Sequence, residues 1–383
     1  MHAATPAAAC ESVASATAHG IEGVTGVASF PPCITQNPYQ RLLYESLAPY
    51  GFELEGDARF KLGWLVGARR RVSVLHFHWP QGYYRHAGRP EALRGPLSWI
   101  RVCLFVGRLT AARLLGYRIA WTIHQVYPHE TRSRRLDRVA ARTLAHFSHV
   151  LIAHDGFTAE RARAELGARG VEIVPHGSYI GVYPEGRPPG VVRDELGISA
   201  EAFVFLCFGH LRAYKDLGLL LEAFRKVSRP TAVLLVAGMG LDAAAAEMLR
   251  TAEAADPRIR SIVGFMPDER VAELFGACDA AVLARSDGGT SGSLILALSL
   301  GLPIVAANTP AYRELIGEDS GWLFEPGAGE PLCLVLEEAI ADPAAVRRKS
   351  SAASRAADRL SWAEIGERTA SLMRNPRLTR QAT

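Results

Sequence analysis

The chain has 383 residues and 49% hydrophobic content, enough for two domains with buried cores. None of its six cysteines forms a C-x-x-C pair, which argues against a zinc framework and predicts reduced thiols in a cytosolic protein. Residues 1–190 carry 22 Lys and Arg against 14 Asp and Glu, whereas residues 191–383 carry 21 against 25. The basic first half indicates an anionic partner, such as phospholipid, a lipid-linked pyrophosphate or nucleic acid, or else simply a solvated basic surface.

Neither a signal peptide nor a membrane-spanning helix is predicted. Residues 1–28 are rich in Ala, Ser, Thr and Gly but have no basic segment followed by an apolar run, so we expect a flexible tail. The most apolar helical stretch, 96–117, is interrupted by Arg101, Arg108 and Arg113 and is too charged to cross a bilayer.

Apolar runs alternate with helical patterns through the first half of the chain. Strands are predicted at 24–30, 72–78, 118–124, 149–154 and 171–175, and helices at 37–47, 96–117 and 133–147. This alternation is typical of a parallel sheet with helices on both faces, where ligands bind beyond the carboxyl ends of the strands. His78, His124, His154 and His176 all lie at such ends. A structural role is the simpler interpretation for any one of them, but together they indicate one polar rim.

The same pattern starts again after a Pro- and Gly-rich segment, 183–190, which reads as a linker between domains. Strands are predicted at 203–208, 232–237, 259–264, 280–286 and 303–307, with helices between them. We therefore expect two doubly wound α/β domains facing a cleft. Their predicted extents are 29–185 and 191–360, with a final helix within 361–383 that returns to the first domain.

A glycine-rich stretch, 287–305, lies between the last two of these strands. It runs from a Gly/Ser/Thr turn into an apolar helix beginning near Leu294. The first N–H groups of a helix have no partner within it and attract anions, so the amides of Thr290 to Ser293 are candidates for binding phosphate. The alternative is an ordinary loop in which Thr290 or Ser291 serves only as N-cap.

Two other predicted strand ends in the second half also carry candidate ligand groups. One is followed by His210, Arg212 and Lys215, and the other by Gly238 to Gly240. Two cations and a helix N-terminus are suited to holding a diphosphate. The turns match neither G-x-G-x-x-G nor G-x-x-x-x-G-K-[ST], which argues against NAD binding and P-loop ATP chemistry.

Several motifs resemble those of GT-B glycosyltransferases, in particular family 4 and its relatives. They are FGHLRAYKD at 208–216, IVPHG at 173–177, VGFMPDERVAELFGACDAAVLARS at 263–286, and PAYRELI with GWLFEPG between 310 and 327. The combination of NPYQ, HFHWP, GHLRAYK and TSGSLILALSLG is closer to bacterial exopolysaccharide transferases of the xanthan mannosyltransferase kind. The resemblance implies a GT-B fold and transfer of a hexosyl group from a GDP- or UDP-sugar.

The chain departs from that family in one respect. The family carries two glutamates eight positions apart, one facing the donor sugar and one holding the ribose, and the aligned positions here hold Gly288 and Leu296. The stereochemistry of transfer, retaining or inverting, and the ribose contact are therefore open. No D-x-D occurs, so we expect neither a metal nor a cofactor to be needed.

The resemblance and the strand-end pattern together give a set of candidate site residues. His124, in a TIHQ turn similar to the family's T-x-H turn, is the first candidate for a general base, ahead of Glu130, His78 and Asp155. His78 and Trp79 are expected on the acceptor side. The residues expected to bind the donor are His210, Arg212, Lys215, Gly238, Phe265, Thr290, Ser291, Gly292, Ser293 and Glu314.

The expected partners are a nucleotide sugar and a saccharide or lipid-linked acceptor, and not nucleic acid. Helix 96–117 and the arginines at 69–71 and 132–135 are candidates for peripheral contact with an anionic membrane, which would place the protein on the inner face of the plasma membrane. Two alternatives remain: a catalytically inactive GT-B protein that acts as a partner or regulator, and a GT-B epimerase or phosphorylase.

Overall fold

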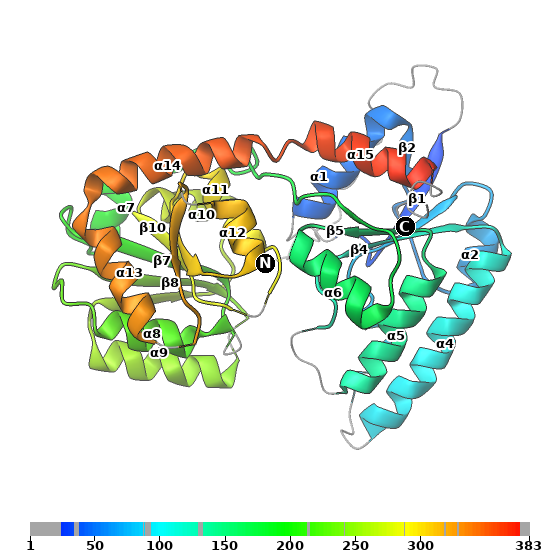
Figure 1. Cartoon of the computed structure of the whole chain (residues 1–383), viewed down its shortest axis with the longest axis horizontal. Helices are drawn as coiled ribbons and strands as arrows, with labels where there is room; N and C mark the ends of the chain where they lie inside the picture. The colour runs from blue at the N-terminus through cyan, green and yellow to red at the C-terminus, as the bar shows by residue number, and fades with distance from the viewer. Residues whose placement is uncertain are drawn as a thin grey trace, which may run out of the picture.

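The computed structural model describes residues 24–33, 38–86, 88, 93–128, 133–212, 215–240, 242–286, 288–317, 319–327 and 329–375. Within these ranges the chain forms two parallel six-stranded sheets (Figure 1). We call the part built on β1–β6 the first domain and the part built on β7–β12 the second. This is the GT-B fold that was expected.

The first sheet has the strand order β2-β1-β3-β4-β5-β6. Its strands are β1 Thr25–Phe30, β2 Phe52–Leu54, β3 Val74–Phe77, β4 Arg118–Ile123, β5 Val150–Ala153 and β6 Val171–Ile173. Its helices are α1 Pro38–Leu47, the 3-10 turn Ala48–Tyr50, α2 Leu62–Ala68, α3 Gln81–Tyr84, α4 Arg94–Leu114, α5 Arg134–Phe147 and α6 Gly156–Leu166. The buried faces of the strands pack against these helices around Phe30, Phe77, Phe105 and Trp121.

The second sheet has the strand order β12-β11-β10-β7-β8-β9. Its strands are β7 Val204–His210, β8 Val233–Met239, β9 Ile259–Val263, β10 Ala280–Leu283, β11 Ile304–Ala307 and β12 Gly321–Phe324. Its helices are α7 Pro189–Glu195, α8 Leu217–Arg225, α9 Ala243–Ala255, α10 Asp268–Gly276, α11 Gly292–Ser299, α12 Pro310–Ile316, α13 Gly329–Ala341 and α14 Pro343–Asp358. The last helix, α15 Trp362–Arg374, packs on the first domain. The order of the strands reverses between β7 and β10, and in open α/β sheets such a switch point is where ligands bind.

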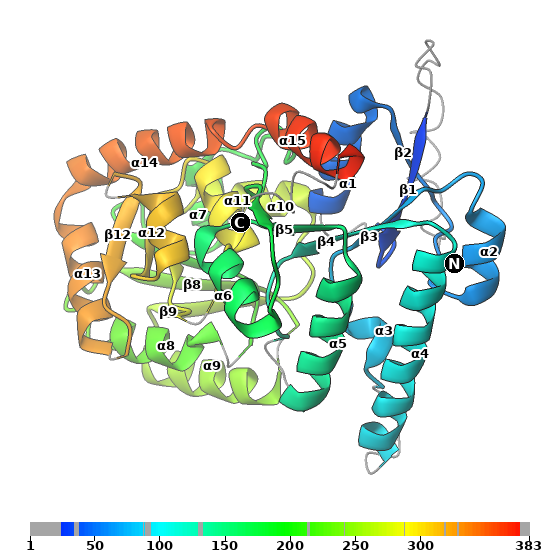
Figure 2. The same ribbon diagram turned by 45° about the vertical axis from the view of Figure 1, so that its right-hand side comes forward.

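The end of the chain returns to the first domain. α14 runs along the second domain, and α15 lies beside α1 (Figures 1 and 2). Trp362 donates from Nε1 to the carbonyl of Ser178 at 2.7 Å, and Arg118 donates to the carbonyl of Met373 at 2.9 Å. Gly366 allows the close approach, because a Cβ there would overlap the carbonyl of Ser46 in α1. These contacts tie the two domains together along one edge.

Three sequence expectations need correction. Residues 25–28 of the expected tail belong to β1, the strand predicted at 24–30, in which every residue from Gly26 to Phe30 is buried. The expected linker ends early, because α7 begins at Pro189, a residue suited to the first turn of a helix. The short strand β2 and helix α2 were not expected, because each is too short to show a clear hydrophobic period. Among the described helices, none has the length and apolar character needed to cross a membrane.

Candidate functional site

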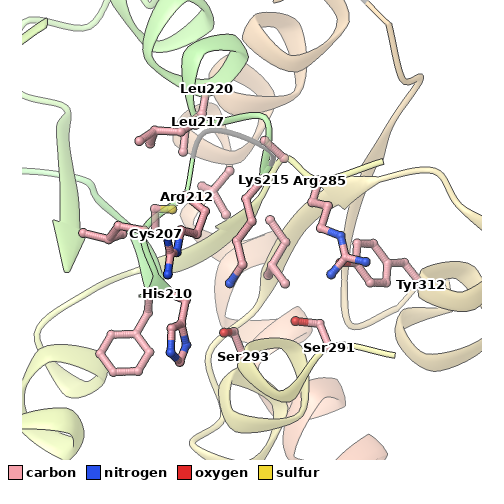
Figure 3. A pocket seen from close by; sticks show the side chains of 15 residues that line it. Cys207, His210, Arg212, Lys215, Leu217, Leu220, Arg285, Ser291, Ser293 and Tyr312 are labelled. Carbon is pink, nitrogen blue, oxygen red and sulfur yellow. The ribbon is translucent and has the colours of Figure 1, made fainter. Parts of the chain in front are cut away.

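A pocket with cationic side chains set in a largely apolar lining opens at the switch point of the second sheet, between the carboxyl ends of β7 and β10. Its lining includes Lys215 and Arg212 from the β7–α8 loop and Arg285 from the β10–α11 loop. Ser291 and Ser293, at the start of α11, face these cations (Figure 3). His210, at the end of β7, and Tyr312 also line the pocket, and the lining contains no carboxylate among the described residues.

Asp216 holds the two loops of this pocket together. It has the left-handed conformation, with φ of 57°, which costs free energy in a residue with a Cβ. Its carboxylate accepts hydrogen bonds from both the N–H and the hydroxyl of Ser286, each at 3.1 Å. Because Asp216 follows Lys215 and Ser286 follows Arg285, these hydrogen bonds hold the two cationic side chains at the same pocket.

Gly209, the second-last residue of β7, leaves space for these side chains. A Cβ at this position would lie 2.8 Å from the hydroxyl of Ser293 and 3.8 Å from the ammonium of Lys215. Both polar groups therefore converge on the same point above the strand end. The φ of 122° at Gly209 is also one that residues with side chains rarely adopt.

The electrostatics of the pocket favour an anion. Burial lowers the pKa of the Lys215 ammonium, and the neighbouring Arg285 and Arg212 lower it further. Burial and the same kind of cationic neighbour also lower the pKa of His210. Positive groups that repel one another in a partly buried site are stabilised when a negative ligand binds between them.

The N-terminus of α11 is only partly as expected. Ser291 is the N-cap, and its hydroxyl makes no capping bond to the helix. The N–H of Thr290, which was expected to point at the phosphate, instead donates to Asp155 of the first domain at 2.8 Å. The amides left for an anion are thus those of the first helical turn, beginning at Gly292.

Leu296 and Gly288, at the two positions where GT-B family 4 carries glutamates, have different surroundings. Leu296 is 4% exposed within the second-domain core, so this position makes no ligand contact. Gly288 lies against the Arg285 guanidinium, which a Cβ at Gly288 would overlap. A cation therefore stands where the family places a carboxylate.

The four histidines expected to share a rim lie together in the first domain, in one buried cluster with a fifth, His76. His124 is the half-buried member, and its ring stacks on Trp79 with centroids 4.3 Å apart. Its Nε2 lies 3.2 Å from Nδ1 of His78, which is only 1% exposed. Burial and neighbouring histidines hold the pKa of His124 well below its usual value, so the ring is neutral at neutral pH. His76, His154 and His176 complete the cluster.

The cluster extends to the donor side through Tyr179. Its ring lies 5.4 Å from that of His176, and its hydroxyl would be 3.7 Å from a Cβ placed on Gly292. The buried Tyr179 side chain therefore lies between the histidine cluster and the start of α11.

Asp155 and Glu314 make contacts between the domains. Asp155 caps α6 by accepting from the N–H of Thr158 at 2.7 Å, and it also accepts from the N–H and hydroxyl of Thr290. Glu314, expected to bind the donor, accepts from the N–H of Gly156 at 3.2 Å. The hydroxyl of Thr158 is a fourth donor to the Asp155 carboxylate, at 3.1 Å, so Asp155 is poorly placed to take a proton from a substrate.

A second cavity, of about 270 Å³, lies between the domains next to these contacts. Gln125, Tyr127, Arg134 and Arg161 line it from the first domain, together with Phe157 and Thr158. Arg285, Gly288 and Gly289 line it from the second. Arg285 thus borders both this cavity and the cationic pocket, which makes the two spaces neighbours.

Of the described sequence candidates, His210, Arg212, Lys215, Ser291 and Ser293 line the first cavity, and the others, His124 included, line neither. Gly238 lines neither, and its lack of a Cβ serves packing, because a Cβ there would overlap the Gly209 carbonyl. Phe265 is 61% exposed in the β9–α10 loop and also lines neither. Glu130 lies outside the described residues. No group of three or more potential metal ligands occurs in the part of the chain that the structure describes.

Sequence reasoning missed Arg285, Asp216, His76 and Tyr44. A charged residue directly after an apolar strand was a usable signal for Arg285, and the H-x-H spacing, which puts His76 and His78 on the same face of a strand, was one for His76. The conformation of Asp216 and the partners of the Tyr44 hydroxyl depend on tertiary contacts and had no local signal.

The chain is similar to known sugar-transferring enzymes. The family model described as Glycosyl transferases group 1 matches residues 191–357. A GDP-mannose:glycolipid 4-beta-D-mannosyltransferase of Xanthomonas campestris pv. campestris is 27% identical over 300 residues, which cover 76% of each protein.

Solved structures share the fold at lower identity. HepE of Anabaena in complex with UDP superposes with a TM-score of 0.70 at 16% identity, covering 92% of this chain and 99% of HepE. WaaG, a glycosyltransferase involved in lipopolysaccharide biosynthesis, has a TM-score of 0.62 at 14% identity, covering 91% and 99%. The second domain thus matches the group 1 glycosyltransferase model, and the whole chain shares the GT-B fold of these solved structures.

Proposed function

We propose that the protein transfers a mannosyl group from GDP-mannose to a hydroxyl of a glycolipid. The observation that carries the proposal is the pocket in which Arg212, Lys215 and Arg285 meet the N-terminus of α11 at the switch point of the second sheet. Such a pocket suits the diphosphate of a nucleotide sugar. The name of the Xanthomonas relative favours GDP-mannose as donor and a glycolipid as acceptor.

The cationic pocket has a direct part in the chemistry. When the bond between the sugar and the diphosphate breaks, negative charge develops on the leaving phosphate. Lys215 and Arg285 are already fixed beside that position by the Asp216–Ser286 bridge, so little reorganisation is needed as the charge grows. Electrostatic stabilisation by preorganised groups of this kind is commonly the largest contribution to catalysis.

His124 is the group best suited to accept the proton of the acceptor hydroxyl. It is half-buried and neutral, whereas His78 is enclosed and Asp155 is fully hydrogen-bonded. Trp79, stacked on the His124 ring, offers an aromatic face to a sugar acceptor. A positioned general base contributes about 10²–10⁴-fold to a reaction rate.

A membrane-bound acceptor requires the first domain to approach the bilayer, and we include this in the proposal. α2 and α4 pack against each other and expose large apolar side chains, including Val66, Ile100 and Leu104, each more than half exposed. Arg70 and Arg71, at the end of α2, are also exposed. Apolar side chains flanked by arginines are typical of surfaces that bind anionic membranes peripherally.

The test is transfer of radiolabelled mannose from GDP-mannose to a lipid-linked oligosaccharide fraction, with UDP-glucose as the competing donor. We expect transfer from GDP-mannose, and a loss of about 100-fold or more in kcat for His124→Gln with nucleotide affinity retained. Transfer from UDP-glucose alone would overturn the assignment of the donor. Binding of neither GDP nor UDP would favour the inactive regulatory alternative.

A further inference from the structure

A continuous hydrogen-bonded chain leads from His124 into the first domain. Nε2 of His124 lies 3.2 Å from Nδ1 of His78, whose Nε2 is 3.0 Å from the Tyr44 hydroxyl. The same hydroxyl lies 3.0 Å from Nδ1 of His76, and Nε2 of His76 is 2.8 Å from the hydroxyl of Thr122. The groups come from α1, β3, β4 and the residues that follow β3 and β4.

The members of this chain are neutral. Burial lowers the pKa of His76 to about 3 and holds that of His78 well below its usual value. Burial also raises the pKa of the Tyr44 hydroxyl, so it remains protonated. Each neutral imidazole has one N–H and one bare nitrogen, and the phenol has one hydrogen to donate.

Neutrality makes the three histidine tautomers depend on one another. Tyr44 lies between two ring nitrogens and donates to only one of them, so it accepts from the other. If Tyr44 donates to His76, then His76, His78 and His124 all carry their hydrogen on Nε2. If it donates to His78, all three carry it on Nδ1. Intermediate arrangements leave two lone pairs or two N–H groups facing each other in a buried site.

We infer that Tyr44 donates to His76 and thereby holds His124 in the tautomer that presents a bare Nδ1 to the acceptor. Tyr44, His76 and His78 are then positioning residues for His124. The inference rests on the proposed function for its catalytic meaning, but the tautomers themselves exist without substrate. Among the ring nitrogens of His76, His78 and His124, Nδ1 of His124 is the one for which the described residues provide no hydrogen-bond partner.

In the transfer step, His124 takes up the proton of the acceptor hydroxyl and the diphosphate takes up the electron pair of the broken bond. The acceptor oxygen attacks the anomeric carbon while its hydrogen moves to Nδ1 of His124, and the pair from the broken sugar–oxygen bond leaves on the diphosphate. His124 is then a cation whose Nε2–H donates to the bare Nδ1 of His78. A charged donor strengthens that hydrogen bond, so His78 stabilises the imidazolium. In the opposite tautomer of His124 the bare nitrogen is Nε2, which already accepts from Nδ1–H of His78, so Nδ1 cannot take the proton of the acceptor.

Nitrogen NMR of protein labelled with ¹⁵N-histidine reads the tautomers directly. His154 and His176 are internal references, because their Nδ1 atoms lie 3.0 and 2.8 Å from backbone carbonyls and must carry the hydrogen. We expect Nε2–H for His76, His78 and His124, assigned by single His→Gln variants, and Nδ1–H for the references. Nδ1–H at His124 in the wild-type protein would overturn the inference.

Tyr44→Phe tests the coupling. It leaves the His78 Nε2–H buried without an acceptor, and a buried orphan N–H is less tolerated than a bare acceptor. We therefore expect the His78 and His124 signals to move toward Nδ1–H, and kcat to fall about tenfold or more with the donor KM unchanged, as for a wrong tautomer. Tyr117→Phe is the matched control, because it also removes a buried hydroxyl. That hydroxyl donates to the Leu65 carbonyl and has no contact with the hydrogen-bonded histidines.

The two variants separate the possible failures. Equal kcat and unchanged histidine signals in Tyr44→Phe and Tyr117→Phe would show that Tyr44 does not set the tautomer. Wild-type protein that shows the expected tautomers but transfers no sugar would instead refute the proposed function, since the NMR readout needs no substrate.

Discussion

The carboxylate of Asp155 accepts hydrogen bonds from both the backbone N–H and the hydroxyl of Thr290, each at 2.8 Å, although the two residues belong to different domains. Asp155 is 1% exposed and at the same time caps α6. The contact joins the first helix after β5 to the glycine-rich turn before α11. It therefore fixes the phosphate-side turn relative to the histidine cluster, whose member His154 precedes Asp155.

Gly289→Ala is expected to open this contact. An added Cβ would overlap the Thr158 hydroxyl and lie 2.8 Å from the Asp155 carboxylate, so the turn must move away. We expect kcat to fall about tenfold or more, because small misplacements of reacting groups cost about 10²-fold. Small-angle scattering should show a larger radius of gyration. Gly107→Ala, at an exposed site in α4 with nothing within 4 Å of its Cβ, is the control; equal kcat in both variants would contradict the role of the contact.

Much of the fold was predictable because it is local. Alternating apolar strands and helices set the two parallel sheets, and parallel strands bring their carboxyl ends to one edge, which is why Lys215 and Ser293 meet although 78 positions separate them in sequence. The Asp155–Thr290 bond was not predictable, since it depends on how two domains dock. The same holds for Tyr44, which lies on a helix whose hydrophobic pattern says nothing about the partner of one hydroxyl.

Lys215→Ala should weaken nucleotide binding. A hydrogen bond to a charged group contributes about 1.5–3 kcal/mol, and ~1.4 kcal/mol is a factor of ten in affinity. Calorimetric titration of GDP should therefore show a dissociation constant at least about tenfold higher. Ser291→Asp, which places a carboxylate at the start of α11, should weaken binding more. Lys226→Ala, at an exposed lysine paired with Glu222, is the control; unchanged GDP affinity in Lys215→Ala and Ser291→Asp would sink the phosphate assignment.

Transfer is expected to survive chelation. The chain has no D-x-D sequence, and the cations that line the pocket can hold a diphosphate without a bridging metal ion. Initial rates should be the same in EDTA and in Mg²⁺ or Mn²⁺. A rate that vanishes in EDTA and returns with either ion would show that the protein cations are insufficient.

Membrane binding through α2 and α4 should combine an electrostatic and an apolar part. Binding to anionic vesicles should weaken as salt rises, because the screening length falls to ~8 Å at physiological ionic strength. Leu104→Ser should weaken it at every salt concentration, whereas Leu334→Ser, at an exposed leucine of the second domain, should not. Vesicle sedimentation measures both. Equal affinity for neutral and anionic vesicles would remove the electrostatic part of the proposal.

The histidine cluster should make the folded state sensitive to mild acid. Burial lowers the pKa of His76 and of His176 to about 3, compared with ~6.5 in an unfolded chain. Above pH ~6.5 both states are neutral there, and the stability is fully present. Between pH ~6.5 and 3 only the unfolded state takes up the protons, so the free energy of unfolding falls with falling pH, by up to ~1.4 kcal/mol per pH unit for each histidine.

The informative interval is pH 6.5 to 5. Carboxylates stabilised by ion pairs, such as Glu273 with its pKa lowered to about 2 by Arg187 and Arg270, lose their contribution only at lower pH. Urea unfolding at pH 7.5 and pH 5 should show a clear fall in the midpoint at pH 5. His76→Gln should reduce the difference between the two midpoints whatever its own stability, because it removes one group that the unfolded state protonates. His146→Gln, at an exposed histidine of α5, should preserve that difference. Identical wild-type midpoints at the two pH values would mean that the buried histidines are not held neutral, and the tautomer coupling through Tyr44 would lose its basis.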